Sequence, residues 1–75
     1  MKHLITLSSP IAIRNGDGQT KMVNVVEATK QQLSAGEVML NIHRYFNSTT
    51  QQMCEAQAIS VHVKASNLRS QQEVQ

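Results

Sequence analysis

The sequence has little of what usually holds a very small protein together. Its 75 residues include one cysteine, Cys54, one proline, Pro10, and only two aromatic side chains, Tyr45 and Phe46. A single cysteine excludes a disulfide scaffold within the chain. No run of about 18 apolar residues occurs, so no candidate transmembrane helix is present. A chain of this length makes one domain at most, and we place that domain at residues 1–66.

Charged residues are also scarce, at 16% of the chain. Seven Lys and Arg against five Asp and Glu give a net charge of +2, and the cations are spread along the sequence. A nucleic-acid surface normally shows basic residues clustered on one face, which this pattern does not suggest. Neutral polarity takes the place of charge, because Ser, Thr, Asn and Gln together supply 26 residues.

The small size of the chain favours self-association. A domain this short buries only about 60–65% of its unfolded surface. Without disulfides or a metal, natural proteins of this size often gain stability by forming oligomers. We therefore expect a homodimer, or a protein that acts on another protein.

The N-terminal third has the pattern of a β-hairpin. The sequence Asn15-Gly16-Asp17-Gly18 contains two dipeptides that favour tight hairpin turns, because these residues tolerate positive φ. Strand-forming residues flank it on both sides. We predict a hairpin with residues 3–14 paired against 20–28, and an edge, bulge or break at Pro10.

The middle of the chain has helical spacing. At 100° per residue, six apolar residues of this segment fall on one arc of a helix: Ala35, Val38, Met39, Ile42, Tyr45 and Phe46. Ser34 fits the first position of a capping box with Glu37 three residues later. The sequence thus predicts one main amphipathic helix over about 35–47, with Tyr45 and Phe46 closing the core and Leu40 outside the apolar arc.

Two patterns compete in residues 48–68. A stripe at helical spacing runs from Cys54 to Leu68, whereas Ile59, Val61 and Val63 alternate with polar residues as in a strand. β-branched residues favour the strand. We expect a short helix or turn near 49–56, a third strand at 58–65 and a polar, frayed tail at 67–75. The fold class is then α+β, with the helix packed on a three-stranded sheet.

No residue pattern indicates catalysis or metal binding. The candidate ligands and nucleophile are His3, His43, His62 and Cys54, and no CxxC, HxxxH or HExxH spacing occurs among them. A lone cysteine is usually a small buried apolar residue. We therefore expect no enzyme activity, no catalytic residues, no cofactor and no metal.

A DNA-binding alternative stays open. A strand at 21–26 followed by two helices would have the element order of a ribbon–helix–helix regulator, in which a dimeric ribbon enters the major groove. Lys21 and Asn24 would then contact DNA. The valine-rich strand leaves few polar positions for reading bases, so this alternative is not favoured.

The preferred hypothesis is a small protein-interaction module, an accessory, regulatory or inhibitor protein of bacterial or prophage type. Its interaction surface would involve Leu40, Arg44, His62 and Lys64, and a strand edge beside Pro10 or at 58–65 could pair with another chain. We expect no membrane partner. Because no segment resembles a secretory signal, we expect the cytoplasm as its location.

Overall fold

The computed structural model describes residues 1–74, and nearly all of them belong to one antiparallel β-sheet. The five strands are β1 (Lys2–Arg14), β2 (Thr20–Ser34), β3 (Glu37–Asn47), β4 (Gln52–Lys64) and β5 (Leu68–Glu73). A single 3-10 turn, η1 (Ala65–Asn67), joins β4 to β5. Residues 1–74 contain no α-helix, so the predicted α+β fold with one main helix is wrong.

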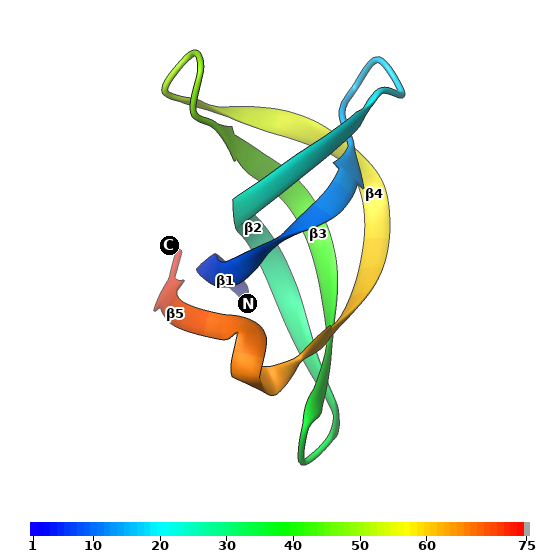
Figure 1. Cartoon of the computed structure of the whole chain (residues 1–75), viewed down its shortest axis with the longest axis vertical. Coiled ribbons are helices and arrows are strands. Elements are labelled where there is room, and N and C mark those ends of the chain that lie inside the picture. The colour runs from blue at the N-terminus through cyan, green and yellow to red at the C-terminus, as the bar shows by residue number, and fades with distance from the viewer. Residues whose placement is uncertain (75) are drawn as a thin grey trace.

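The strands are arranged in the order β4-β3-β2-β1-β5. The first four form a meander, and η1 then returns the chain so that β5 pairs with the other side of β1 (Figure 1). The sheet curls strongly, and a bridge between Asn15, which directly follows β1, and Ala56 of β4 connects the two sides of the curl. The result is a partly closed barrel with its core inside and β4 and β5 as its two edges.

The predicted N-terminal hairpin is confirmed. β1 pairs with β2 in antiparallel register around the turn. The Asn15 side-chain oxygen accepts hydrogen bonds from the N–H groups of Asp17, at 3.0 Å, and Gln19, at 2.9 Å. Gly18 has φ +82°, a left-handed conformation that costs a glycine little. Turn chemistry therefore specifies this hairpin locally.

The segment predicted as a helix over 35–47 forms the β2–β3 turn and β3. Val38, Leu40 and Ile42 alternate toward the core and are each at most 1% exposed. The ladder then shifts, because Ala28 faces Ile42 while the preceding residue, Glu27, faces Arg44. This β-bulge inserts one extra residue on β3 and restores an inward side chain at Tyr45.

The bulge explains the misleading helical spacing. Inward positions in β3 are separated by two, two and then three residues, so 38, 42 and 45 imitate one face of a helix. The helical period correctly placed Val38, Ile42 and Tyr45 on the buried side, but it wrongly added Phe46 and excluded Leu40. Only the pairing with β2 and β4 shows that these residues lie on a bent strand.

The segment 48–68 contains more strand than expected. Of the short helix or turn expected near 49–56, the turn is present, at residues 48–51, whereas the helix is wrong because β4 begins at Gln52. The strand expected at 58–65 lies largely within the longer β4. Residues 68–73 of the tail expected to be frayed at 67–75 form β5, in which Ser70 faces Thr6 of β1, and residue 75 lies outside the described residues.

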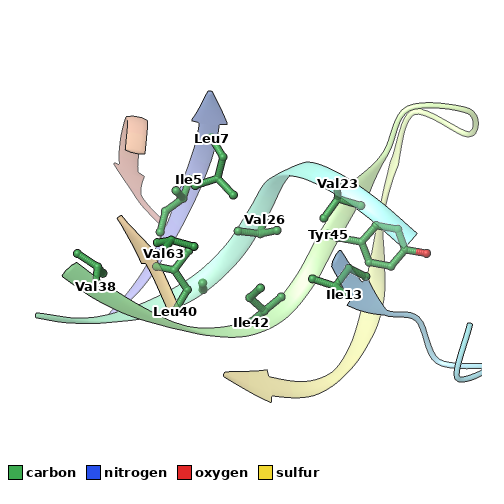
Figure 2. Close-up of a cluster of buried hydrophobic side chains, with 11 residues drawn as sticks. Ile5, Leu7, Ile13, Val23, Val26, Val38, Leu40, Ile42, Tyr45 and Val63 are labelled. Carbon is green, nitrogen blue, oxygen red and sulfur yellow. The ribbon is translucent and has the colours of Figure 1, made fainter. Parts of the chain in front are cut away.

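The core is a single cluster of apolar side chains contributed by the first four strands, and Figure 2 shows its labelled members converging between them. Ile5, Val26 and Leu40 are fully buried. Tyr45 is 5% exposed and lies at one end of the cluster, whereas Phe46 is only half-buried and is not a member. The expectation that both aromatics close the core therefore holds for Tyr45 alone.

Pro10 lies in an irregular stretch of β1. Thr6 faces Val25 and Ile11 faces Val23, so four residues of β1 between these pairs oppose a single residue of β2. The Asn67 side chain supports the bulge, accepting a 2.7 Å hydrogen bond from the Ser9 N–H and donating one of 3.3 Å to the Ser9 carbonyl. Proline fits here because its missing N–H removes no bond of a regular ladder.

Candidate functional site

β4 is the last strand on one side of the sheet. One hydrogen bond near its end shows which of its residues direct their backbone N–H and C=O groups toward β3 and which direct them away. The Ala65 N–H donates to the Gly36 carbonyl over 2.9 Å, beside the pair formed by Glu37 and Lys64. In an antiparallel ladder a bond in this position flanks a non-hydrogen-bonded pair. Lys64 therefore does not exchange backbone hydrogen bonds with β3.

Hydrogen-bonded and non-hydrogen-bonded pairs alternate along the β3–β4 ladder, which is regular from residue 64 to residue 59 of β4. The residues that bond β3 through their backbone are Val63, Val61 and Ile59. The residues that direct their N–H and C=O groups away from β3, toward the free side, are Lys64, His62 and Ser60. In the described chain, no strand pairs with this side of residues 59–64, and the isolated bridge from Asn15 reaches β4 only at Ala56.

The side chains under this edge are incompletely covered. Val61 faces Leu40 and Ile59 faces Ile42, and both partners on β3 are at most 1% exposed. Val61 and Ile59 themselves are only half-buried. The physical cause is that, among the described residues, no strand pairs with this stretch of β4 on its other side. The edge thus combines free backbone groups with uncovered apolar surface.

A hollow of about 450 Å³ lies beside this edge. Its walls come from the β1 bulge, the end of β4 and η1, and include Ser8, Ser9, Ile11, His62, Lys64 and Asn67. Because Asn67 already bonds both backbone groups of Ser9, the β1 wall is satisfied there. The unpaired backbone of β4 is therefore the feature of this hollow that could bind an extended chain.

The other edge of the sheet is poorly suited to pairing. β5 has six residues, and Arg69 and Glu73 place charges near its two ends. Short and charged edge strands are the features by which natural sheets resist further pairing. The two edges therefore differ, and β4 is the better candidate for binding.

The outer, convex face of the curled sheet, opposite the core, carries a cluster of charged residues. Glu27 is 4% exposed, and the Arg44 Nη2 donates to its Oε2 over 2.6 Å, with the Lys2 Nζ at 3.9 Å from Oε1. The Arg44 hydrogen bond lowers the pKa of Glu27 although burial alone would raise it. The same bond raises the pKa of Arg44, with a further contribution from Glu55.

This cluster lines a shallow hollow of about 390 Å³, together with His43. The His43 Nε2 lies 3.0 Å from the Thr29 hydroxyl oxygen. Lys2 and Arg44 are balanced by Glu27 and Glu55, so the hollow offers no net charge to a ligand. We interpret the cluster as an ion-pair network that allows a carboxylate to be buried on the sheet.

The residues predicted for the interaction surface separate in the structure. Leu40 is 0% exposed within the core, so its predicted exposure is wrong. Arg44 pairs with Glu27 on the convex face. On the edge strand, the His62 Nε2 contacts the carboxylate of Glu37 from β3, and Lys64 is also exposed. Only His62 and Lys64 therefore belong to the β4 edge, which lies where the sequence predicted an exposed strand edge.

Lys21 and Asn24, the residues predicted to contact DNA, are exposed on β2. The ribbon–helix–helix arrangement that gave them this role is wrong, because residues 34–47 and 49–58 form turns and strands instead of two helices. Lys21 lines a third hollow, of about 310 Å³, beside Met22 and Phe46. That hollow contains one lysine and offers no basic surface.

The histidines and the cysteine lie apart from one another. His3 is on β1, His43 on β3, and His62 and Cys54 on β4. In the described part of the chain, no three His, Cys, Asp or Glu residues come close enough to hold a metal ion. Cys54 packs half-buried against the core. The Nδ1 of His3 is buried without a hydrogen-bond partner among residues 1–74.

Which backbone groups of β4 are free could not be predicted from the sequence, because it depends on pairing with β3. The alternation of Ile59, Val61 and Val63 with polar residues was the one sequence signal that pointed to this edge strand.

The structure of residues 1–74 has no helix that could cross a membrane. No protein-family model matches this chain, and neither a curated protein nor a solved structure shows significant similarity to it.

Proposed function

We propose that this chain is a small protein-interaction module, with an accessory, regulatory or inhibitory role, that binds through the free edge of β4. An extended segment of another chain would pair with this edge as an additional strand. Such β-augmentation obtains affinity from main-chain hydrogen bonds and specificity from alternate side chains. The module needs no catalytic residues of its own for this role.

The observation that carries the proposal is the outward direction of the backbone groups of Ser60, His62 and Lys64. Unpaired edge groups next to uncovered apolar side chains are a known template for pairing with another chain. Ile59 and Val61 supply that apolar surface here. The wall formed by Ser9 and Asn67 would border the added strand without competing for its hydrogen bonds.

Site-specific photo-crosslinking in cells of the source organism tests the proposal. A benzophenone amino acid replaces His62 on the β4 edge, and in a matched variant it replaces Arg69 on the β5 edge. Both side chains are exposed, so the two probes sample solvent to a similar degree. We expect discrete protein adducts from position 62, whether to this chain or to another protein, and far fewer from position 69.

Proline at Ser60 provides the control for specific pairing. This substitution removes an N–H that does not bond β3, whereas Ser60→Ala keeps it. Adducts from position 62 should disappear with Ser60→Pro and persist with Ser60→Ala. Equal adducts from both edges, or adducts unaffected by Ser60→Pro, would contradict binding through β4. A shift of random duplex DNA at 50 mM salt, absent any protein adduct, would favour nucleic-acid binding instead.

A further inference from the structure

We propose that the strand added to β4 is the β4 of a second copy, antiparallel to the first and related to it by a two-fold axis through Val61. This inference rests on the proposed function, because it names the occupant of the same edge. It is carried by the backbone phase, by the side-chain pattern and by the charges of residues 58–64.

The backbone phase is self-complementary. An antiparallel pair of strands exchanges hydrogen bonds between residues that both direct N–H and C=O across the interface. With the axis at Val61, Ser60 faces His62 of the second copy, and His62 faces its Ser60. All four of these residues direct their backbone groups outward. Val61 then faces itself in a non-hydrogen-bonded pair, the closer of the two kinds.

The inner side chains are also self-complementary. Residues directly opposite in an antiparallel pair lie on the same face of the sheet. Ile59 would face Val63 of the second copy, and Val61 would face Val61. The half-buried row of β4 would then be covered by an identical row, and the two cores would join beneath one continuous sheet.

Neighbouring registers fit less well. An axis at Ser60 places Val63 opposite Gln57 of the second copy, an exposed polar residue. An axis at His62 places two histidines directly opposite each other. With the axis at Val61, Lys64 faces Ala58, so no like charges meet across the interface. The sequence of the edge therefore favours the register centred on Val61.

The symmetry limits the assembly to two copies. A two-fold interface uses the same patch on both subunits and closes on itself. The edges left at the ends of the joined sheet are the two β5 strands, which are short and charged. The expected product is a discrete dimer of the 8.3 kDa chain.

Sedimentation equilibrium of the full chain from about 1 to 200 μM tests the mass. We expect the wild type and Ser60→Ala to sediment as dimers, and Ser60→Pro to dissociate at least tenfold more readily. Proline is tolerated on an edge strand where its N–H would face solvent, so the fold should survive. Far-UV circular dichroism of each variant checks this point. A dimer insensitive to Ser60→Pro would overturn the proposal.

A disulfide trap tests the register without relying on proline. In a Cys54→Ala background, Val61→Cys should form an intermolecular disulfide on mild oxidation. Opposed Cα atoms in a non-hydrogen-bonded pair are about 4.5 Å apart, within the range that disulfides span. Ser70→Cys, on the β5 edge, is the control and should remain reduced much longer. Equal oxidation at both positions would contradict the register.

Different experimental results would refute the dimer alone or the dimer together with the proposed function. A monomer at every concentration, with no disulfide at position 61, refutes the second copy as occupant. If the probe at His62 still captures a different protein, in a manner sensitive to Ser60→Pro, binding through the β4 edge stands. If neither self-association nor an adduct depends on Ser60, both proposals fail.

Discussion

At the scale of single residues, Glu27 shows how one of the few carboxylates of this chain is buried and still paired with cations. Its carboxylate is 4% exposed on the convex face of the sheet. Burial disfavours the charged form, but the hydrogen bond from Arg44 and the charge of Lys2 favour it. The lowered pKa of Glu27 shows that the partners outweigh burial. The chain has few carboxylates, and it buries this one between two of its seven cations.

The lowered pKa predicts a pH dependence of stability. Because the folded-state pKa lies below the ordinary value of 4.5, Glu27 contributes stability above pH 4.5 that is lost as the pH falls through the folded-state pKa. We expect the free energy of unfolding of the wild type to drop relative to Glu27→Gln between pH 5 and pH 2. Urea titrations at several pH values measure this difference.

Glu73→Gln is the control for this effect. It removes an exposed carboxylate on β5 and leaves the Glu27–Arg44 pair intact. This variant should lose stability on acidification as the wild type does. Parallel pH profiles for the wild type and Glu27→Gln would show that the Glu27 ion pair contributes nothing to folding.

At the scale of elements, β3 is the strand that decides the fold. It pairs with β2 on one side and β4 on the other, and the bulge at His43 keeps Tyr45 in the core. Met39 and Leu40 are adjacent and lie on opposite faces of this strand. A helix would place Met39 on its apolar arc and Leu40 outside it, which makes the pair diagnostic.

We therefore expect Leu40→Ala to cost about 2–5 kcal/mol of unfolding free energy, because its side chain is completely buried. Met39→Ala should cost clearly less, since Met39 is only half-buried on the convex face. Denaturant titrations of both variants measure the two costs. A larger loss from Met39→Ala would be the result expected for a helix and would contradict the strand.

At the scale of the whole molecule, the last strand completes the sheet. β5 covers the edge of β1, where Ile5 and Leu7 are at most 1% exposed. The Lys30 Nζ also donates to the Gln71 Oε1 over 2.8 Å, which links β5 to β2. Leu68 packs against the core, and the polar residues 69–73 pair with β1 through their backbone, which does not require apolar side chains.

A truncation tests this role of the C-terminal strand. A chain ending at Asn67 lacks β5 and exposes the second edge of β1, so we expect it to be unfolded or aggregated at room temperature. A chain ending at Val74 keeps β5 and should melt cooperatively, close to the full chain. Circular dichroism melting curves of the two chains distinguish these results. A cooperative transition without β5 would mean that the tail is dispensable.

Local chemistry made some elements predictable. The Asn15–Gly18 turn supplies its own hydrogen bonds and its own left-handed residue, so the first hairpin could be identified from sequence. The edge strand at 58–65 was recognisable from three alternating β-branched residues. β3 was not predictable in this way, because its bulge changes the spacing of its apolar residues to one that a helix shares.

The sequence by itself determined the first turn and the strand character of residues 59–63. Only the tertiary structure decided that Leu40 is buried, that β5 is a strand, and which backbone groups of β4 remain free. The physical reason is that helical and bulged-strand spacings overlap over ten residues. Pairing between distant strands, such as β1 with β5, resolves what local spacing leaves ambiguous.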